Sequence, residues 1–355
     1  MARVAVMGAG TWGTTLAVLL ARNRHDVCLW ARSAECADSI RRERRNLRYL
    51  PDTLLSEGIS STDSSPEALA GADVAVFAVP SRAMREVARL AASDIPPGAL
   101  VITVAKGIEI GTGKRMSEVL QDELADGQTR PLAAVSGPNL SAEVLQGVPT
   151  MSVAASADRD AAAAAQALFS QPVFRLYLNE DIAGVELGGA LKNIIAIAAG
   201  INDGLGFGAN SKAALITRGI VEMGRLAGRL GGKVETLAGL AGVGDLIATC
   251  HSRHSRNWTV GYRIGRGEQV RDILASLRTV AEGVPTTEAA AELSGRLGVK
   301  MPITHELHQV LFEGKAPGVA VKDLMDMELG DELKHLGARD CPPAAGRRRR
   351  GSSRP

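Results

Sequence analysis

Short apolar runs alternate with segments of helical spacing over roughly the first 175 residues of the chain. The apolar runs have the length and β-branched content of strands: Val4–Met7, Val27–Trp30, Val74–Val79, Leu100–Ala105, Ala133–Ser136, Met151–Ala155 and Phe174–Tyr177. Helical patterns lie between them, including Thr14–Asn23, a short segment that starts at Ser65-Pro66, and one that Ser81 caps and that runs through Leu90. This alternation predicts a parallel sheet with crossover helices.

Strand patterns stop at about residue 180, and glycines and prolines separate helical patterns from there on. The expected helices are Asp181–Gly204, Ser211–Leu230, Ser255–Gly265, Val270–Leu277, Thr286–Leu297 and Thr304–Phe312. We therefore expect an α/β domain over residues 1–178, an all-α domain over 179–330 and a disordered tail over 331–355. The tail is rich in proline, glycine and arginine, which does not favour a packed core.

Composition narrows the class of protein. The 355 residues are 45% hydrophobic and 23% charged, and 41 basic against 39 acidic side chains give a net charge of +2. So small a charge creates no global field that favours nucleic acid or a membrane surface. The four cysteines form no C-x-x-C pair, the run Ile194–Ile201 is too short to span a bilayer, and no signal peptide precedes the first strand. We expect a cytoplasmic protein without nucleic-acid partners or membrane insertion.

A glycine pattern follows the first strand directly. Gly8, Gly10 and Gly13 have the spacing G-x-G-x-x-G and open the first helical segment. In a dinucleotide site the first glycine permits a tight turn, the second admits a pyrophosphate, and the third allows close packing of helix on strand. The pattern predicts a Rossmann-type domain that binds a dinucleotide at the helix start. The alternative is an ordinary glycine-rich turn between a strand and a helix.

The end of the second strand bears on cofactor choice. Enzymes committed to NAD usually place an acidic residue about 20 residues after the glycines, where it binds the ribose 2′-hydroxyl. Arg32 and Ser33 stand there instead, and a cation with a hydroxyl suits a 2′-phosphate. We expect NADP to be accepted beside NAD, unless Arg32 is only a solvated residue at a strand end.

Two lysines are candidates for chemistry. Lys106 follows a buried strand at the sheet edge where ligands bind, beside Ser81 and the turn that begins at Ser136. Lys192 lies in an apolar helix, where burial would lower its pKa toward the range useful for proton transfer. Asp245 could hold that lysine in place. The alternative for Lys192 is a side chain that extends along the helix to solvent.

The start of another helix offers an anion site. Ser255, Arg256 and Asn257 combine a cap, a guanidinium and an amide, which together suit a phosphate. Plain capping with an exposed arginine is the alternative. Cys250, His251 and His254 lack a second cluster to complete a metal site, so we expect no metal.

Together these motifs resemble one known family, the bacterial NAD(P)-dependent glycerol-3-phosphate dehydrogenases, over roughly residues 1–330. The matching motifs, in chain order, are Gly8-Ala9-Gly10-Thr11-Trp12-Gly13-Thr14, Asn46-Leu47-Arg48-Tyr49-Leu50-Pro51, Val79-Pro80-Ser81, Lys106-Gly107-Ile108-Glu109, Ser136-Gly137-Pro138-Asn139, Gly188-Gly189-Ala190-Leu191-Lys192-Asn193-Ile194, Lys212-Ala213-Ala214-Leu215-Ile216-Thr217-Arg218-Gly219, Gly244-Asp245-Leu246, Ser255-Arg256-Asn257 and Glu282-Gly283. The resemblance implies a fold like that of 6-phosphogluconate dehydrogenase, a homodimer, and reversible reduction of dihydroxyacetone phosphate to sn-glycerol 3-phosphate for phospholipid synthesis.

The resemblance also implies roles for individual residues. Lys192 would donate or accept the proton. The substrate site would comprise Lys106, Gly137, Asn139, Lys192, Asp245, Ser255, Arg256 and Asn257. The cofactor would contact Gly8, Gly10, Thr11, Trp12, Gly13, Arg32, Lys106, Ser141, Arg256, Val280 and Glu282.

Two other functions fit parts of the pattern. One is a related two-domain NADP-dependent reductase of the ketopantoate or hydroxyacid type, whose carboxylate substrate would not need the Ser255-Arg256-Asn257 phosphate site. The other is a nucleotide-sensing protein without catalytic activity, which would have no use for a lysine inside an apolar helix.

Overall fold

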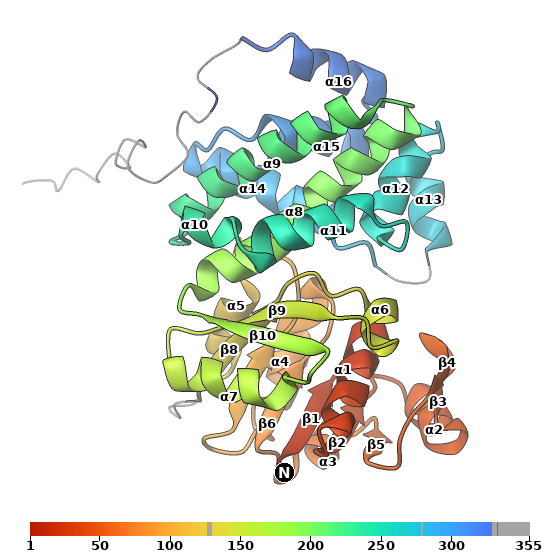
Figure 1. The fold of residues 1–355 in the computed structure, drawn as a ribbon, viewed down its shortest axis with the longest axis vertical. Coiled ribbons are helices and arrows are strands. Elements are labelled where there is room, and N and C mark those ends of the chain that lie inside the picture. Colours follow the sequence, from red (N-terminus) through yellow and green to blue (C-terminus); the bar gives the residue numbers. More distant parts are fainter. Residues whose placement is uncertain (126–129, 278–279, 329–331, 333–355) are drawn as a thin grey trace, which may run out of the picture.

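A mixed sheet forms the centre of the N-terminal half, and the strand that leads into the glycine-rich loop lies inside it, away from both edges (Figure 1). The computed structural model describes residues 1–125, 130–277, 280–328 and 332. Within them the sheet runs in the order β10-β9-β8-β7-β6-β1-β2-β5. Its strands are β1 (Arg3–Met7), β2 (Asp26–Trp30), β5 (Ile59–Thr62), β6 (Val74–Phe77), β7 (Leu100–Thr103), β8 (Leu132–Ser136), β9 (Thr150–Ala155) and β10 (Phe174–Asn179), and a hairpin joins β3 (Arg45–Asn46) to β4 (Leu50–Leu54).

The prediction of an all-parallel sheet is wrong at one edge. Strand β9 pairs antiparallel with β8, and β10 pairs parallel with β9. A parallel return needs a long crossover, usually a helix. The chain between β8 and β9 holds only the five-residue helix α6 (Ser141–Leu145), so it turns back at the carboxyl end of β8. The apolar pattern of a buried strand is the same in both directions and did not reveal this reversal.

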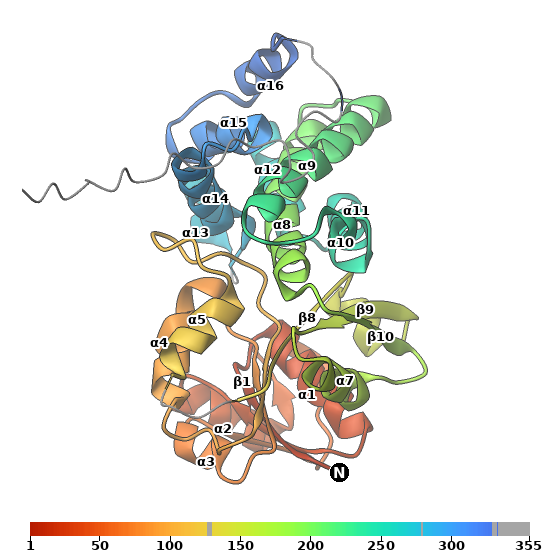
Figure 2. The ribbon, with the colours of Figure 1, turned by 90° about the vertical axis from the view of Figure 1, so that its left-hand side faces the viewer.

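Helices cover both faces of the sheet (Figure 2). They are α1 (Thr11–Arg22), α2 (Ala34–Glu43), α3 (Ser65–Leu69), α4 (Met84–Ala91), α5 (Met116–Glu123) and α7 (Arg159–Phe169). Alternate residues of β1 face opposite sides: Val4 and Val6 pack with α1 and α7, whereas Ala5 and Met7 pack with α3, α4 and α5. Apolar residues on both faces explain why these strands read as short continuous runs.

The C-terminal half is helical and packs around one long helix. It comprises α8 (Ile182–Gly204), α9 (Ala209–Arg229), α10 (Val234–Leu237), α11 (Asp245–His251), α12 (Arg256–Gly265), α13 (Val270–Ser276), α14 (Gly283–Leu297), α15 (Pro302–Phe312) and α16 (Pro317–Met325). The sequence analysis missed α10, α11 and α16, and also a single π-helical turn at Leu240–Gly244 that leads into α11. The tail predicted over residues 331–355 lies outside the described residues, Glu332 apart.

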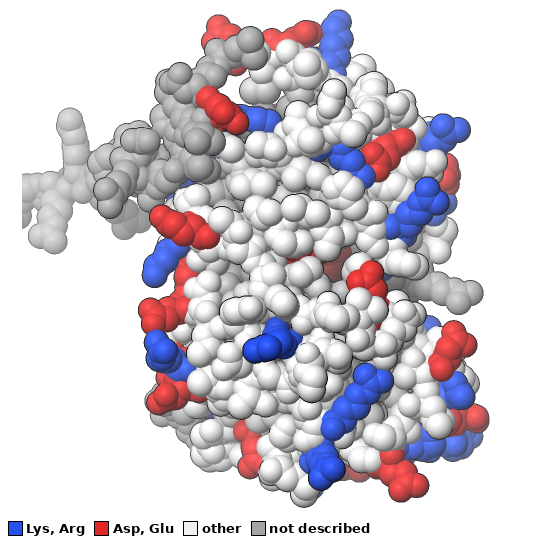
Figure 3. All heavy atoms as spheres, in the orientation of Figure 1, with Lys and Arg blue, Asp and Glu red and all other residues white. Residues whose placement is uncertain are grey.

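Helix α8 passes through the middle of this half. By length and composition it could cross a membrane, with a mean hydropathy of 1.5, but 89% of that apolar stretch is buried inside the protein. The apolar stretch of this helix is therefore longer than the uninterrupted run 194–201 indicated. Figure 3 shows acidic and basic side chains interspersed around the rim of one face of the molecule, in keeping with the small net charge.

Helix α12 crosses α8 at backbone contact. A Cβ atom on Gly261 would lie 1.9 Å from the carbonyl oxygen of Ile197, and one on Gly200 would lie 2.1 Å from that of Trp258. Only glycine allows this approach. The crossing fixes the start of α12 beside the helix that carries Lys192.

Candidate active site

The glycine-rich loop has room for a phosphate at the start of α1. Gly8 has a φ of +126°, and its N–H donates to the carbonyl of Trp30 at 3.1 Å. A Cβ on Gly13 would lie 1.9 Å from the Gly8 oxygen, whereas one on Gly10 would meet nothing within 4 Å. Gly10 precedes the helix without any side-chain cap, so the first N–H groups of α1 point into that open space. This geometry fits a dinucleotide pyrophosphate.

Asn46 stabilises the same loop, and the sequence analysis gave it no individual role. Its buried side-chain amide donates to the carbonyl of Ala9 and to the hydroxyl of Thr14, both at 2.8 Å. The available signal was its place at the head of the motif that runs to Pro51. Asn46 therefore ties the phosphate loop to the hairpin that follows α2.

Arg32 is exposed, two residues beyond Trp30 at the carboxyl end of β2. The adjacent Ser33 caps α2, because its hydroxyl accepts from the Cys36 N–H at 3.3 Å. Within the part of the chain that the structure describes, the Arg32 side chain makes no hydrogen bond or ion pair, whereas the Ser33 hydroxyl is already engaged. Thr11 and Trp12 form the half-buried first turn of α1.

A buried carboxylate holds both candidate lysines. The Lys192 ammonium on α8 donates to Oδ1 of Asp245 at 2.9 Å and to the Thr249 hydroxyl at 2.5 Å. The Lys106 ammonium donates to the other oxygen, Oδ2, at 2.7 Å and to the Gly137 carbonyl at 2.8 Å. The two halves of the chain therefore meet at Asp245, which opens α11.

Burial and charge act against each other in this cluster. Burial lowers the pKa of Lys192 to about 8, with a further contribution from the Lys106 charge and opposition from Asp245. Burial alone would raise the pKa of Asp245, but the two ammonium groups together lower it below its usual value. Burial also raises the pKa of the neighbouring Cys250 thiol to about 12. Lys192 can therefore exchange a proton near neutral pH while Asp245 stays ionised.

The turn after β8 contributes polar groups next to Lys106. Gly137 has a φ of +151°, and a Cβ there would lie 2.8 Å from the Ser152 hydroxyl. The Asn139 amide donates to that hydroxyl at 3.1 Å. Among the described residues, the buried Asn139 Oδ1 and Ser136 hydroxyl find no hydrogen-bond partner. Ser141 begins α6 close by and is half-buried.

The three residues at the start of α12 point in different directions. The Ser255 hydroxyl caps the helix by accepting from the Trp258 N–H at 3.2 Å. The buried Asn257 side chain donates to Asn193 at 2.8 Å and accepts from the Gly283 N–H at 2.9 Å.

Arg256 is the exposed member of this triplet, and its guanidinium donates to the Val280 carbonyl at 2.9 Å. Among the described residues no other hydrogen bond of the Arg256 guanidinium is found, so its remaining N–H groups can donate to an anion.

Ser81 and Glu282 connect the two halves on the other side of the site. The Ser81 hydroxyl donates to the Glu282 carboxylate at 2.5 Å, and its N–H donates at 3.3 Å. The expected cap function of Ser81 is therefore wrong: the chain makes a tight turn at Ser81–Ala83 before α4 begins at Met84. Burial raises the pKa of Glu282.

These features define a class of protein. A nucleotide loop on a Rossmann-type domain, facing a buried lysine on a helical domain, is the arrangement of a two-domain NAD(P)-dependent dehydrogenase. The model described as NAD-dependent glycerol-3-phosphate dehydrogenase N-terminus matches residues 3–162, and its C-terminus counterpart matches residues 181–322. The chain belongs to the NAD-dependent glycerol-3-phosphate dehydrogenase family.

Individual relatives agree with this assignment. The chain is 51% identical to a glycerol-3-phosphate dehydrogenase [NAD(P)+] of Chlorobium chlorochromatii over 326 residues, which cover 92% of this chain and 98% of the relative. The crystal structure of glycerol-3-phosphate dehydrogenase from Coxiella burnetii superposes with a TM-score of 0.88 at 37% identity, covering 92% of this chain and 99% of that one. A ketopantoate reductase from Ralstonia eutropha, at 18% identity and a TM-score of 0.56, shares the fold alone.

Proposed function

We propose that this protein catalyses the reversible reduction of dihydroxyacetone phosphate to sn-glycerol 3-phosphate with NADPH or NADH. The observation that carries the proposal is the pair of lysines on one buried carboxylate, Lys192 and Lys106 on Asp245. A ketone that accepts a hydride needs a proton donor at its oxygen and positive charge around the developing alkoxide. The cluster provides both.

Lys192 is the group we propose for proton transfer. In its ammonium form it donates a proton to the substrate oxygen as the alcohol forms, and in the reverse direction the neutral amine takes that proton back. The bound reduced nicotinamide supplies the hydride. Asp245 and Thr249 hold the Lys192 nitrogen in place, which limits the reorganisation needed at the moment of transfer.

The substrate site extends from Lys106 to the start of α12. We assign the phosphate to Arg256, which is exposed, and a hydroxyl of the substrate to the turn that contains Gly137 and Asn139. The orphan oxygen of Asn139 gives that turn an unmet polar group that a ligand hydroxyl can satisfy. Ser255 and Asn257 support this site by fixing the start of α12. Ser255 caps the helix, and Asn257 joins it to α8 and α14.

The cofactor lies along the glycine-rich loop in this proposal. The space beside Gly10 at the start of α1 would hold its pyrophosphate, and Arg32, beyond the end of β2, would bind at the adenosine ribose. The further contacts are Gly8, Thr11, Trp12, Gly13, Lys106, Ser141, Arg256, Val280 and Glu282. Glu282 accepts hydrogen bonds from Ser81, so a cofactor contact there would join or replace that pair.

We also propose where the domains divide. We place the boundary between residues 178 and 179; strand β10 ends at Asn179 and α8 begins at Ile182, which supports a division within a few residues of that point. A homodimer and a cytoplasmic location follow from the resemblance to the family, and sedimentation of the purified protein would test the dimer.

A direct assay tests the function. Purified protein is mixed with NADPH or NADH, each with dihydroxyacetone phosphate, and absorbance of the reduced nicotinamide is followed. We expect substrate-dependent oxidation of both, and no comparable oxidation with ketopantoate. Oxidation with ketopantoate alone would favour the other reductase class, and no oxidation with either ketone would favour a sensor.

A further inference from the structure

Residues 107–115, here called the bridging segment, connect β7 to α5 and contact the helical half at several positions. Ile108 is 2% exposed and belongs to the apolar core of the helical half. Arg296 of α14 donates to the carbonyls of Gly111 at 3.2 Å and Thr112 at 3.0 Å. At the far end, Arg115 pairs with the buried Glu186 on α8 at 2.6 Å. The segment begins directly after Lys106. Its position therefore affects the backbone position from which the Lys106 side chain extends.

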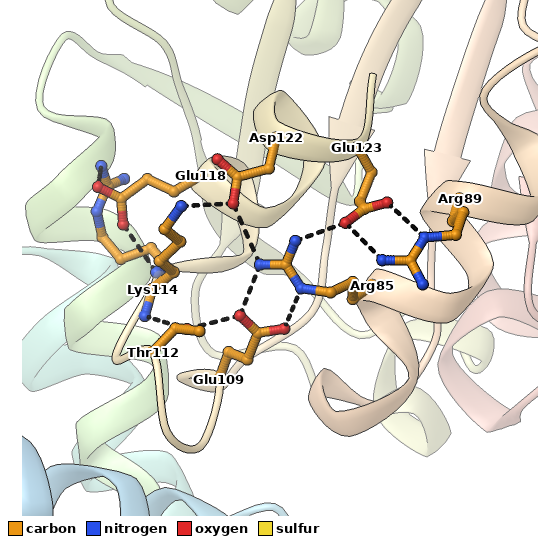
Figure 4. Close-up of polar contacts among 9 residues, drawn as sticks. Arg85, Arg89, Glu109, Thr112, Lys114, Glu118, Asp122 and Glu123 are labelled. Carbon is orange, nitrogen blue, oxygen red and sulfur yellow. Dashed lines mark hydrogen bonds and ion pairs between the residues drawn. The ribbon is translucent and has the colours of Figure 1, made fainter. Parts of the chain in front are cut away.

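In the N-terminal half, Arg85 on α4 anchors the bridging segment at Glu109, and Asp122 on α5 pairs with Lys114 of the segment (Figure 4). Arg85 on α4 donates to both oxygens of Glu109, at 2.7 and 2.8 Å. The same guanidinium reaches Glu123 at 2.6 Å and Asp122 at 3.2 Å on α5. These hydrogen bonds, with that from Arg85 first, lower the pKa of Glu109, so its carboxylate stays ionised across the neutral range.

The segment is also closed on itself. The Glu109 carboxylate accepts from the Thr112 hydroxyl at 2.6 Å, and the Glu109 N–H donates to the Lys114 carbonyl at 2.9 Å. Glu109 is thus the point where the internal hydrogen bonds of the segment meet the anchor on α4. Loss of the Glu109 carboxylate would remove the anchor on α4 and the hydrogen bond from Thr112 at the same time.

We propose that Arg85 and Glu109 are positioning residues that keep the Lys106 ammonium on Asp245 by holding the bridging segment between the two halves. Glu109 is three residues from Lys106, so fixing the backbone at Glu109 limits the movement of the backbone at Lys106. Gly107 between them has no side chain to fix its own position, and a Cβ there would lie 2.4 Å from Ser81. A long lysine side chain loses much conformational freedom when it is held in one place, so it needs a fixed backbone.

This inference rests on the proposed function, since it assigns a task to Lys106 in that site. It also predicts the direction in which the pKa of Lys192, the proposed proton-transfer group, changes when Lys106 is displaced. The Lys106 charge contributes to the lowered pKa of Lys192, as burial does, whereas Asp245 raises it. If Lys106 moves away, the pKa of Lys192 must rise.

The chain offers a matched control on the same helix. Arg89 lies one turn beyond Arg85, and among the described residues its hydrogen bonds go to Glu123 alone, at 2.9 and 3.1 Å. Replacing it with glutamine removes the same charge and breaks an ion pair with the same α5 carboxylate. It leaves the contact between Arg85 and the bridging segment intact.

The experiment compares Arg85→Gln, Glu109→Gln and Arg89→Gln with the parent in two measurements. The first is amide hydrogen exchange of the free protein over residues 104–115. The second is the pH dependence of kcat/KM for reduction of dihydroxyacetone phosphate. For Arg85→Gln and Glu109→Gln we expect faster exchange, a loss of about tenfold in kcat/KM and an alkaline midpoint at higher pH. Arg89→Gln should match the parent in exchange rate, in kcat/KM and in the alkaline midpoint.

Equal behaviour of Arg85→Gln and Arg89→Gln in exchange and midpoint would overturn the inference. If Arg85→Gln does not fold, Glu109→Gln carries the same test. A parent protein that does not reduce dihydroxyacetone phosphate would refute the proposed function instead, and the exchange measurement would still decide whether Arg85 holds the segment.

Discussion

Lys192 and Asp245, 53 positions apart in the chain, lie 2.9 Å apart with side chains only 7% and 3% exposed. A charge pair so far from water is a poor source of stability, because desolvation offsets most of the attraction. A role in proton transfer explains this buried pair better than a role in stability. A lysine whose pKa is lowered to about 8 can give and take a proton at the pH of a cell.

The pH dependence of the reaction should report this lysine. In the proposed mechanism reduction needs the ammonium form of Lys192, so kcat/KM for dihydroxyacetone phosphate should fall as pH rises through about 8. Oxidation of glycerol 3-phosphate needs the neutral amine, so its kcat/KM should rise over the same range. Asp245→Asn removes the charge that raises the pKa of Lys192, and the midpoint should move to lower pH. A midpoint that moves up, or stays in place, would show that another group titrates.

Arg32 should determine the cofactor preference. NADPH should serve at least as well as NADH, because Arg32 is exposed at the end of β2 beside the glycine loop. Arg32→Asp should reverse the preference, since the carboxylate repels the 2′-phosphate and accepts from the ribose hydroxyl. Lys322→Asp on α16 makes the same charge change in the helical half and serves as the control. The measurement is the ratio of kcat/KM with NADPH to kcat/KM with NADH. An unaltered ratio in Arg32→Asp would show that Arg32 does not determine cofactor preference.

Arg256 should bind the phosphate of the substrate. Charge-assisted hydrogen bonds contribute roughly 1.5–3 kcal/mol each, so Arg256→Ala should raise the KM for dihydroxyacetone phosphate by about 10–100-fold. Unphosphorylated dihydroxyacetone should be a poor substrate for the parent and the variant alike, with little further loss. Arg253→Ala, which removes an exposed arginine from the preceding loop, should change neither KM.

Because Arg256 also contacts Val280, the affinity for NADPH is measured in parallel. Equal proportional losses for both ketones would show that Arg256 serves the structure of α12 and not the phosphate.

A second buried carboxylate predicts a pH-dependent stability. Glu222 on α9 accepts from the N–H groups of Ile303 at 2.6 Å and Thr304 at 3.2 Å, where α15 begins. Burial raises its pKa from 4.5 to about 7. The folded state therefore holds this proton more tightly than the unfolded state, and its contribution to stability is complete below pH 4.5 and is lost as pH rises through 7.

Replacing Glu222 with glutamine should remove that dependence. Between pH 5 and 8 the free energy of unfolding of the parent should fall by roughly 3 kcal/mol more than that of Glu222→Gln, at about 1.4 kcal/mol per pKa unit. Glu235→Gln, at an exposed position, is the control and should follow the parent. Chemical denaturation at several pH values measures this difference, and parallel curves for Glu222→Gln and the parent would contradict the assignment.

Local pattern predicted much of the fold, because strand length, helical spacing and glycine turns depend on residues close together in the chain. The strands at Val27 and Val74 and the helix that Asp181 caps lie within a few residues of their predicted bounds. The direction of β9 did not follow from pattern, since a buried strand looks alike in either direction. The one indication of the antiparallel pairing in the sequence was the short connection between β8 and β9.

The site was predictable as a set of residues but not as a geometry. Lys106 and Asp245 are 139 positions apart, and Ser81 and Glu282 are 201 apart, so no local spacing could pair them. Asn257 shows the opposite case, in which local pattern suggested a ligand contact. In the structure its side chain is engaged with Asn193 on α8 and with the N–H of Gly283 on α14, contacts that no local spacing could predict.

Replacement of Lys192 tests the central claim most directly. Lys192→Met keeps most of the side-chain volume but cannot transfer a proton, and Lys106 still neutralises Asp245. We expect kcat for reduction of dihydroxyacetone phosphate by NADPH to fall at least ~100-fold, with the affinity for NADPH nearly unchanged. A kcat within a few-fold of the parent would contradict the account and would shift proton transfer to Lys106.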